Sequence, residues 1–309
     1  MLPHLRRRRA RMMGETMLPR TALSLVAIAT LAGSPAAFGQ SGLEIPTPDF
    51  VVQRAWEHAG GLEAFGRLGI VLADFSTEEN TQEGNPTTTR SKTYFLAPGP
   101  TPGRIEIEAI KAVSGDSGGR QAGWAVIGGK PDIRQSTQMM VKKLLTTNLF
   151  TLMLPFSLNW DGVLLKTVEP TVVKGVPVWR LSIEVARGFF HSPQIATTWR
   201  IDFDRKTYAV VQAESPATDL GKGLKADGMR ISWAKLQDVR GIRLPGEQRT
   251  IGLSETGAEK AHSRLEQVRY SVLEAEGNAA MFRDPVPPGL RPTPQVGPSK
   301  GLPMPRPKT

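Results

Sequence analysis

The chain of 309 residues has no cysteine and only four histidines. Without cysteine there are no disulfide bonds, no thiolate nucleophiles and no zinc sites built on thiolates. A cysteine-anchored lipoprotein is excluded for the same reason. The histidines are scattered in the sequence, and no pair has the spacing of metal ligands; they are His4, His58, His191 and His262. We therefore expect no metal and no other cofactor.

Motifs of the common enzyme classes are missing as well. The sequence has no phosphate-binding P-loop and no dinucleotide fingerprint. The glycine-rich segment 114–119 is similar to the surroundings of some serine nucleophiles, but no base accompanies it. A hairpin loop explains this polar segment better.

Two pairs of carboxylates remain to be explained, Asp202 with Asp204 and Glu106 with Glu108. Alternate residues of a strand share a face, so each pair would point the same way. A solvated sheet face or a turn accounts for both pairs. His191 follows two phenylalanines and is a candidate cavity residue, although a loop explains it better. We do not expect an enzyme. A hydrolase that uses Asp202, Asp204 or His191 is the least favoured hypothesis.

Long hydrophobic runs are scarce, and the longest lies near the N-terminus. The run at 22–32 is too short for a comfortable membrane span and follows a basic region that includes Arg6 to Arg9. Small residues around Ala37 offer a cleavage site before Gln40. We interpret residues 1–39 as an export signal, with Met17 as an alternative start and a retained anchor as the alternative reading. We expect a soluble periplasmic protein, with secretion as the other destination.

The net charge of +10 overstates the basicity of the exported chain. Six arginines and one glutamate among residues 1–40 supply half of this charge. The rest is spread along the sequence without a basic cluster that interleaves aromatic residues, so we expect no nucleic-acid partner. A weak preference for anionic membrane surfaces stays open, and with it a transient contact with such a surface.

One long helical pattern stands out, from Ser136 to Leu158. Ser136 is a suitable N-cap residue, and Pro155 should end the helix because proline lacks an amide hydrogen. Its apolar residues recur at i, i+4 and i+5, as on one wide face of a helix. These residues are Met140, Leu144, Leu145, Leu149, Leu152 and Met153.

Most of the remaining chain alternates with a period of two. A short amphipathic helix, with Thr47 as N-cap and Gly60-Gly61 as its end, precedes these strands. Short turns between the strands favour one antiparallel meander. The roughly ten or eleven expected strands are Ile70–Thr77, Thr88–Phe95, Arg104–Val113, Gly123–Ile127, Val163–Val168, Val176–Ala186, Thr197–Phe203, Tyr208–Glu214, Met229–Val239, Arg243–Gly252 and Arg264–Leu273.

The last part of the chain has a different composition. Nine prolines fall between Pro285 and Thr309, among few apolar residues. We expect an extended, disordered tail over 289–309 and a single folded domain over 40–288. A ligand for a proline-recognition domain is the sharper interpretation of this tail.

Tryptophans fall in or beside the predicted strands, at Trp124, Trp160, Trp179, Trp199 and Trp233. Phe150 and Phe156 lie in or just after the long helix. In an open, strongly curved sheet such side chains would line the inner face. Taken singly they are ordinary core residues, but the architecture favours a lipophilic cavity.

Several short motifs follow one another along the chain as they do in the lipoprotein-carrier superfamily, and the chain resembles that superfamily in this respect. The superfamily includes the periplasmic chaperone LolA and its outer-membrane receptor LolB. The segment Ile201–Tyr208 resembles a hairpin of that family in which a turn containing aspartate joins two strands. Val239–Pro245 resembles its Gly, apolar, x, Leu-Pro corner, and Met281–Pro285 its phenylalanine-proline ending. The resemblance covers residues 48–288, and it assigns no functional residue of the carrier to this chain.

The resemblance implies an α+β fold, mainly antiparallel β: a curved half-barrel with a short N-terminal helix and a lid or plug helix in its concave face. It implies a non-catalytic carrier for a lipid or the acyl chain of a lipoprotein. The expected cavity and lid residues are Met140, Leu144, Leu145, Leu149, Phe150, Leu152, Met153, Trp199 and Trp233. The alternative is a structural or interaction protein of the envelope with a filled core, in which an envelope partner recognises the tail.

Overall fold

The computed structural model describes residues 44–80, 86–99, 101–108, 110–116, 121–132, 134–191, 198–221, 224–226 and 228–283. The chain divides into two units, Met1–Leu43 and Glu44–Thr309, and the description concerns the second. The predicted export signal and the predicted tail lie outside the described residues. Within the described ranges, no helix is both long enough and apolar enough to cross a membrane.

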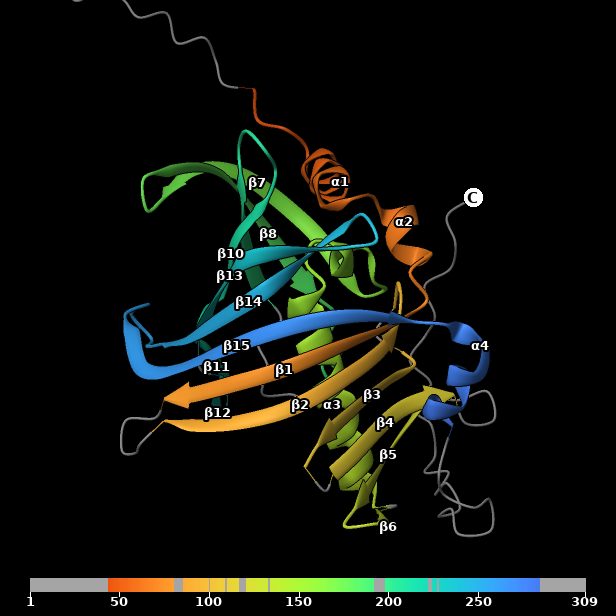
Figure 1. Ribbon diagram of the computed structural model, residues 1–309. Helices are drawn as coiled ribbons and strands as arrows, with labels where there is room; N and C mark the ends of the chain where they lie inside the picture. The colour runs from red at the N-terminus through yellow and green to blue at the C-terminus, as the bar shows by residue number, and fades with distance from the viewer. Residues whose placement is uncertain are drawn as a thin grey trace, which may run out of the picture. The chain divides into compact units, whose positions relative to one another are not determined.

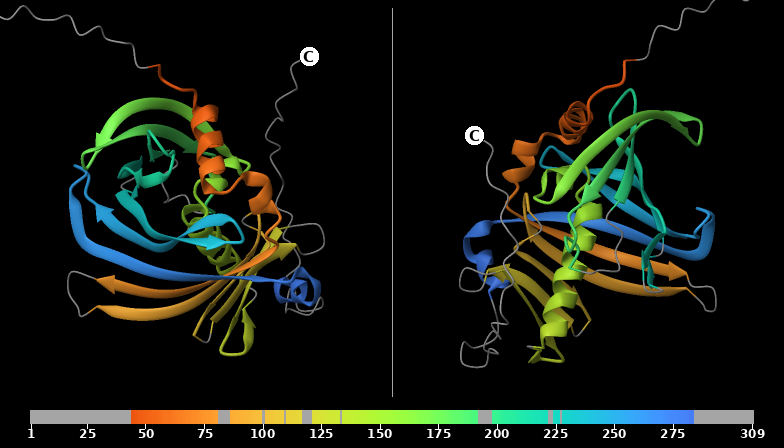
Figure 2. Two further views of the ribbon diagram at one scale, coloured as in Figure 1. Left: turned by 45° about the horizontal axis from the view of Figure 1, so that its top comes forward. Right: turned by 180° about the vertical axis from the view of Figure 1, so that it is seen from behind.

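One antiparallel sheet of 13 strands dominates the unit, in the order β6-β5-β4-β3-β2-β1-β15-β14-β13-β10-β9-β8-β7. It curves around the helix α3 (Figures 1 and 2). The strands are β1 Ile70–Asn80, β2 Thr87–Leu96, β3 Gly103–Ile107, β4 Ile110–Asp116, β5 Gln121–Ile127, β6 Lys130–Asp132, β7 Val163–Val173, β8 Val176–Val185, β9 Thr198–Asp204, β10 Val210–Ser215, β13 Gly228–Val239, β14 Ile242–Leu253 and β15 Glu259–Leu273. A separate hairpin pairs β11 Thr218–Gly221 with β12 Leu224–Ala226.

The order shows two meanders that meet where the first strand pairs with the last. Strands β1 to β6 run outward on one side of this seam, and β15 back to β7 runs outward on the other. The two edges of the sheet, β6 and β7, are therefore consecutive strands in the sequence. The helix α3, Gln135–Leu152, joins them across the concave face. Its 18 residues span about 27 Å.

The alternating pattern of the sequence accounts for the sheet. In β1 the side chains of Val71, Ala73, Phe75 and Thr77 are buried, and the side chains between them are more exposed. Ile70, the first residue of the strand, is buried as well. The register places Phe75 opposite Val268 of β15. The antiparallel meander predicted from this alternation, and the curved half-barrel with few helices implied by the resemblance, are confirmed.

The number of strands differs from the prediction. The predicted strand Arg104–Val113 is in fact a hairpin of β3 and β4. Its turn contains Glu108, at a positive φ of 49°, where a glycine or asparagine would have marked the turn. The short strands β6, β11 and β12 were not predicted.

The helix α3 also differs in its ends. It begins at Gln135 after the N-cap residue Arg134, so the predicted N-cap Ser136 is wrong. A carboxylate outside the helix holds this end instead: Asp132 accepts hydrogen bonds from the Arg134 amide at 3.1 Å and from the Thr137 hydroxyl at 2.9 Å. The helix ends at Leu152, and a 3-10 turn, η1 Phe156–Asn159, follows Pro155.

The N-terminal helix α1, Pro48–Ala59, is confirmed with its predicted ends. The Thr47 hydroxyl accepts a hydrogen bond from the Phe50 amide at 3.3 Å, and Gly60 ends the helix at a φ of 112°. A Cβ at Gly60 would lie 2.3 Å from the carbonyl oxygen of Gly241, so glycine is needed there for space as well as conformation. The remaining helices are α2 Leu62–Gly66, α4 Ala275–Asn278 and η2 Ala279–Phe282.

The core has two parts of unequal size, and α3 contributes to both. The larger part joins α1, α2, η1 and the C-terminal end of α3 to the inner side chains of the sheet, Leu149 and Phe150 among them. The smaller part contains five buried residues, Ile105, Ala112, Ala125, Val141 and Leu145. The two halves of α3 therefore lie in different surroundings.

Candidate functional site

The C-terminal half of α3 is built into the larger core. Leu149, Phe150, Leu152 and Met153 are each no more than 2% exposed. The ring of Phe150 meets four other aromatic rings at centroid distances of 5.3 to 6.2 Å. Trp199 is one of these four rings and is fully buried. This half of the helix is consequently held by dense aromatic packing.

Hydrogen bonds from distant segments fix the chain just after α3. Trp56 of α1 donates from Nε1 to the carbonyl oxygen of Pro155 at 3.0 Å. The Ser157 hydroxyl donates to the carbonyl oxygen of Phe150 at 2.7 Å. Trp160 donates from Nε1 to the carbonyl oxygen of Pro98, in the turn after β2, at 2.8 Å. The segment after α3 is thus joined by hydrogen bonds to α1, to α3 itself and to the turn after β2.

The N-terminal half of α3 is held more lightly. Val141 and Leu145 pack against the sheet in the smaller core, and Leu144 is partly buried beside them. Met140 is 49% exposed, as is its neighbour Met139. This half has one buried edge and one exposed edge.

The predicted site residues therefore lie in different places. Leu149, Phe150, Leu152, Met153 and Trp199 belong to the larger core, and Leu145 to the smaller one. Trp233 lies on β13, where its Nε1 donates to Gln248 at 3.0 Å, and lines a slot of about 40 Å³ beside α1. None of the nine expected cavity and lid residues lines the cavity described next.

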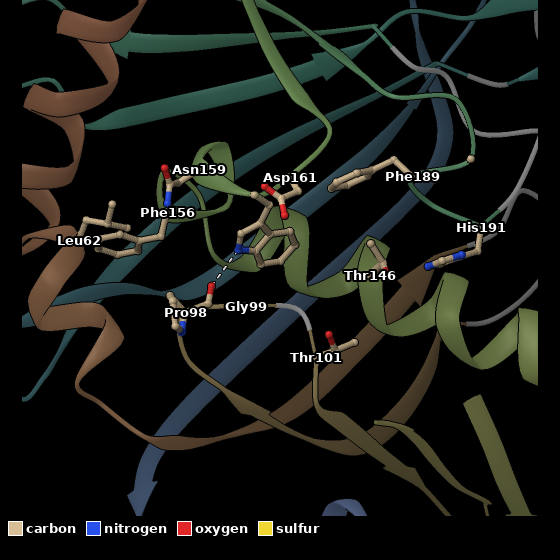
Figure 3. A pocket seen from close by; sticks show the side chains of 12 residues that line it. Leu62, Pro98, Gly99, Thr101, Thr146, Phe156, Asn159, Asp161, Phe189 and His191 are labelled. Atoms are coloured by element: carbon tan, nitrogen blue, oxygen red, sulfur yellow. Dashed lines mark hydrogen bonds between the residues drawn. The ribbon is translucent and has the colours of Figure 1, made fainter. Parts of the chain in front are cut away.

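A larger cavity opens at the C-terminal end of α3 (Figure 3). Its volume is about 510 Å³, within the range of small-molecule sites. Four segments form it: the turn after β2, α3 with η1, the start of α2, and the segment after β8. Its lining residues are Leu62, Pro98, Gly99, Thr101, Thr146, Phe156, Asn159, Trp160, Asp161, Gly188, Phe189 and His191.

The cavity has an aromatic wall and a polar rim. Phe156 stacks on Phe65 of α2, with ring centroids 4.2 Å apart. Phe189, labelled in Figure 3, and Trp160 also line the cavity. Partial burial lowers the pKa of His191, and Lys142 lowers it further. The imidazole is therefore mainly neutral at pH 7 and offers one donor and one acceptor. The sequence favours a loop for His191, whereas Phe156 and Trp160, which also line the cavity, were expected on the inner face of the sheet.

The carboxylates considered for hydrolysis have structural partners. Asp202 is fully buried and accepts two hydrogen bonds from Arg180, at 2.8 and 3.0 Å, and one from Gln212 at 2.9 Å. Asp204 accepts from the backbone amides of Lys206 and Thr207, which lowers the pKa of Asp204. Both carboxylates are thereby committed to holding the β8–β9–β10 region.

Other titratable groups give no metal site. Within the described ranges, no three histidine or carboxylate side chains are grouped as metal ligands. His262 contacts Glu79 at 2.8 Å. Burial lowers the pKa of His58, with a further contribution from Arg243.

No protein-family model matches the chain, and no curated protein matches its sequence. Solved structures do match its fold. A domain named for outer membrane lipoprotein sorting, from Vibrio parahaemolyticus, is 13% identical, with a TM-score of 0.49 over 77% of this chain and 100% of that one. A LolA superfamily protein from Nitrosomonas europaea is 7% identical, with a TM-score of 0.47 over 74% and 94%.

A DUF1329 family protein from Desulfovibrio piger is 13% identical, with a TM-score of 0.50 over 77% of this chain and 98% of that one. At these identities the likeness is one of fold. The match at a TM-score of 0.50, together with the 13-stranded sheet that curves around α3, confirms the expected fold. The chain is therefore similar in its fold to that structure.

Proposed function

We propose that this protein is a non-catalytic carrier that binds a lipid, or the acyl chain of a lipoprotein, in the cavity at the C-terminal end of α3. The observation that carries the proposal is the cavity itself, about 510 Å³ with an aromatic wall. Phe156, Trp160 and Phe189 offer apolar surface to a chain, while Asn159 and His191 offer hydrogen bonds to a headgroup.

The energetics of such binding need no catalytic group. Each methylene removed from water contributes about 0.8 kcal/mol, so ten methylenes give on the order of 8 kcal/mol. Before the costs of ordering, this corresponds to a dissociation constant on the order of micromolar. Such an affinity suits a carrier that must also release its ligand.

Uptake would involve the N-terminal half of α3 rather than the whole helix. The smaller core that holds this half has five buried residues, whereas the other half is packed among aromatic rings and anchored by hydrogen bonds. Lifting the lighter half would uncover Val141 and Leu145 beside the already exposed Met140. Methionine suits such a surface because its flexible thioether adapts to different shapes.

The proposal includes the setting that the sequence predicts. Residues 1–39 would direct export to the periplasm, and residues 40–288 would form the carrier domain. The cargo would be a lipid or an acylated lipoprotein, with transient contact at a membrane surface. No cofactor takes part.

Binding of a fluorescent fatty acid probe, cis-parinaric acid, tests the cavity. Leu62→Trp places bulk at the cavity wall, because the half-buried Leu62 lines it. The matched control is Val172→Trp, at a position that is 62% exposed on β7 and outside the cavity. We expect Leu62→Trp to weaken binding about tenfold or more and Val172→Trp to leave it within about twofold, where tenfold corresponds to 1.4 kcal/mol. No uptake by the unaltered protein, or equal binding by both variants, would contradict the proposal.

A second candidate is an envelope interaction protein of the same fold with a filled core. The buried side chains of α3 favour it, since Leu149 and Phe150 occupy the concave face where a carrier would hold its ligand. This candidate predicts a specific partner that is lost when residues 289–309 are removed. Pull-down with the full chain and the shortened chain distinguishes the two candidates.

A further inference from the structure

The strand β7 leaves one edge of the sheet open. It is the last strand in the order, and it pairs with β8 only. Over the described part of the chain no other strand pairs with its second edge. Such an edge presents unpaired backbone N–H and C=O groups to a further strand. The opposite edge, β6, has three residues, whereas β7 has eleven.

A groove of about 800 Å³ runs between β7 and α1, which lie near one another in both views of Figure 2. On the helix side, Pro48, Asp49, Val52, Gln53 and Trp56 line the groove and share one face of α1. On the strand side, four consecutive residues line it, Val163 to Lys166. Since consecutive side chains of a strand point to opposite faces, a groove touched by four in a row follows the edge of the strand.

The side chains around the groove indicate what it would hold. Leu164 is 51% exposed and offers an apolar contact. Asp49 and Asp161 are exposed, and neither forms an ion pair with the described residues. The one lysine, Lys166, is paired with Glu184 at 2.9 Å. A segment with an apolar and a cationic side chain would therefore complement the groove.

The open edge is interrupted at Lys166, the last of the four groove residues, and again farther along β7. The register of β7 shifts between Leu165 and Thr167, which marks a bulge. Pro170, farther along the strand, has no amide hydrogen to donate. Bulges and prolines are devices that limit pairing at sheet edges. Continuous pairing is thus limited to the groove residues before the bulge, Val163 to Leu165.

We propose that the groove between α1 and β7 binds an extended segment of a partner polypeptide, which adds as a short strand along Val163–Leu165 and places a lysine or arginine beside Asp49 and Asp161. A groove between an edge strand and a helix is suited to this mode of recognition. Backbone hydrogen bonds supply the register, and the two carboxylates select the charge. The groove shares Asn159, Trp160 and Asp161 with the lipid cavity, but the strand pairing depends on β7 and the face of α1, which do not line that cavity.

The probe is a fluorescein-labelled peptide of alternating lysine and valine, with fluorescence anisotropy as the readout. A second peptide of the same sequence carries N-methyl groups on every amide and so cannot donate the backbone bonds. A third has glutamate in place of lysine. We expect the first peptide to bind, and the second and third to bind at least about tenfold more weakly, a difference of 1.4 kcal/mol.

Two protein variants locate the site. Leu164→Lys places in the groove a longer side chain with the same charge as the lysines of the peptide. Val172→Lys makes the same kind of change on the same strand but outside the groove. Leu164→Lys should weaken binding about tenfold, a 1.4 kcal/mol change, and Val172→Lys should leave it within about twofold. The Val163 amide already donates to the carbonyl oxygen of Trp160 at 3.1 Å, so hydrogen exchange should show protection by the peptide at the amide of Leu165. Equal binding by the N-methylated peptide, equal effects of the two variants, or no binding at millimolar peptide would overturn the proposal.

Discussion

The two halves of α3 should respond differently when a buried leucine is truncated in each. Leu149 is fully buried in the larger core and Leu145 is 1% exposed in the smaller one. Truncation of a buried leucine to alanine costs about 2–5 kcal/mol, and the cost falls where the surroundings can close over the cavity. We expect about 4 kcal/mol for Leu149→Ala and about 2.5 kcal/mol for Leu145→Ala. Met140→Ala, at a half-exposed position, should stay within about 0.5 kcal/mol.

Urea titration gives the three free energies of unfolding, and native-state amide hydrogen exchange shows where each loss acts. Exchange by local opening occurs at a free energy below that of global unfolding. We expect the amides of 139–146 to exchange by such opening, and Leu145→Ala to accelerate them while leaving the amides of 149–153 governed by global unfolding. Leu149→Ala should accelerate both groups.

The opposite result would be informative. If all amides of α3 exchanged with one free energy, and if Leu145→Ala and Leu149→Ala shifted them equally, the helix would open as one unit. The division of α3 into an anchored and a lighter half would then be wrong, and the proposed route of lipid uptake would fail with it.

Three further changes have defined outcomes. Gly60→Ala should lower the thermal midpoint more than Gly61→Ala, because both residues have positive φ but only at Gly60 would the Cβ meet a backbone oxygen; equal midpoints would contradict this. Burial raises the pKa of Glu266 above 4.5, so its ionised form costs stability as the pH rises above that value. The thermal midpoint of the Glu266→Gln variant minus that of the unaltered protein should therefore increase from pH 4 to pH 8. A difference that stays constant with pH would refute the reasoning. The pKa of Asp204 is lowered by its amide partners, so Asp204→Ala should cost about 1 kcal/mol in urea titration at pH 7, a loss that shrinks as the pH falls through and below 3.8.

The sequence predicted the fold well where its signals were local. The period of two located most strands, and Thr47 and Gly60 marked the ends of α1, because caps and alternation depend on near neighbours. The hairpin of β3 and β4 was missed because alternation continues through its turn at Glu108. The start of α3 was misplaced because its capping carboxylate, Asp132, lies outside the helix.

The candidate site was harder to predict for a different reason. Its cavity forms where four segments meet, and Phe189, Thr146 and Leu62 carry no pattern that announces such a meeting. The apolar stripe of α3 was visible, but its division between two cores depends on which strands each half touches. The pairing of β1 with β15, which places β6 and β7 at the two edges, decides that geometry and leaves no local mark on the sequence.

The most direct test of the central claim is native mass spectrometry of the exported, processed protein, with solvent extraction of any bound lipid. The carrier account predicts a species heavier than the polypeptide by the mass of a lipid, and loss of that species on Leu62→Trp but not on Val172→Trp. A bare polypeptide mass that stays unchanged after incubation with phospholipid and fatty acid would contradict it.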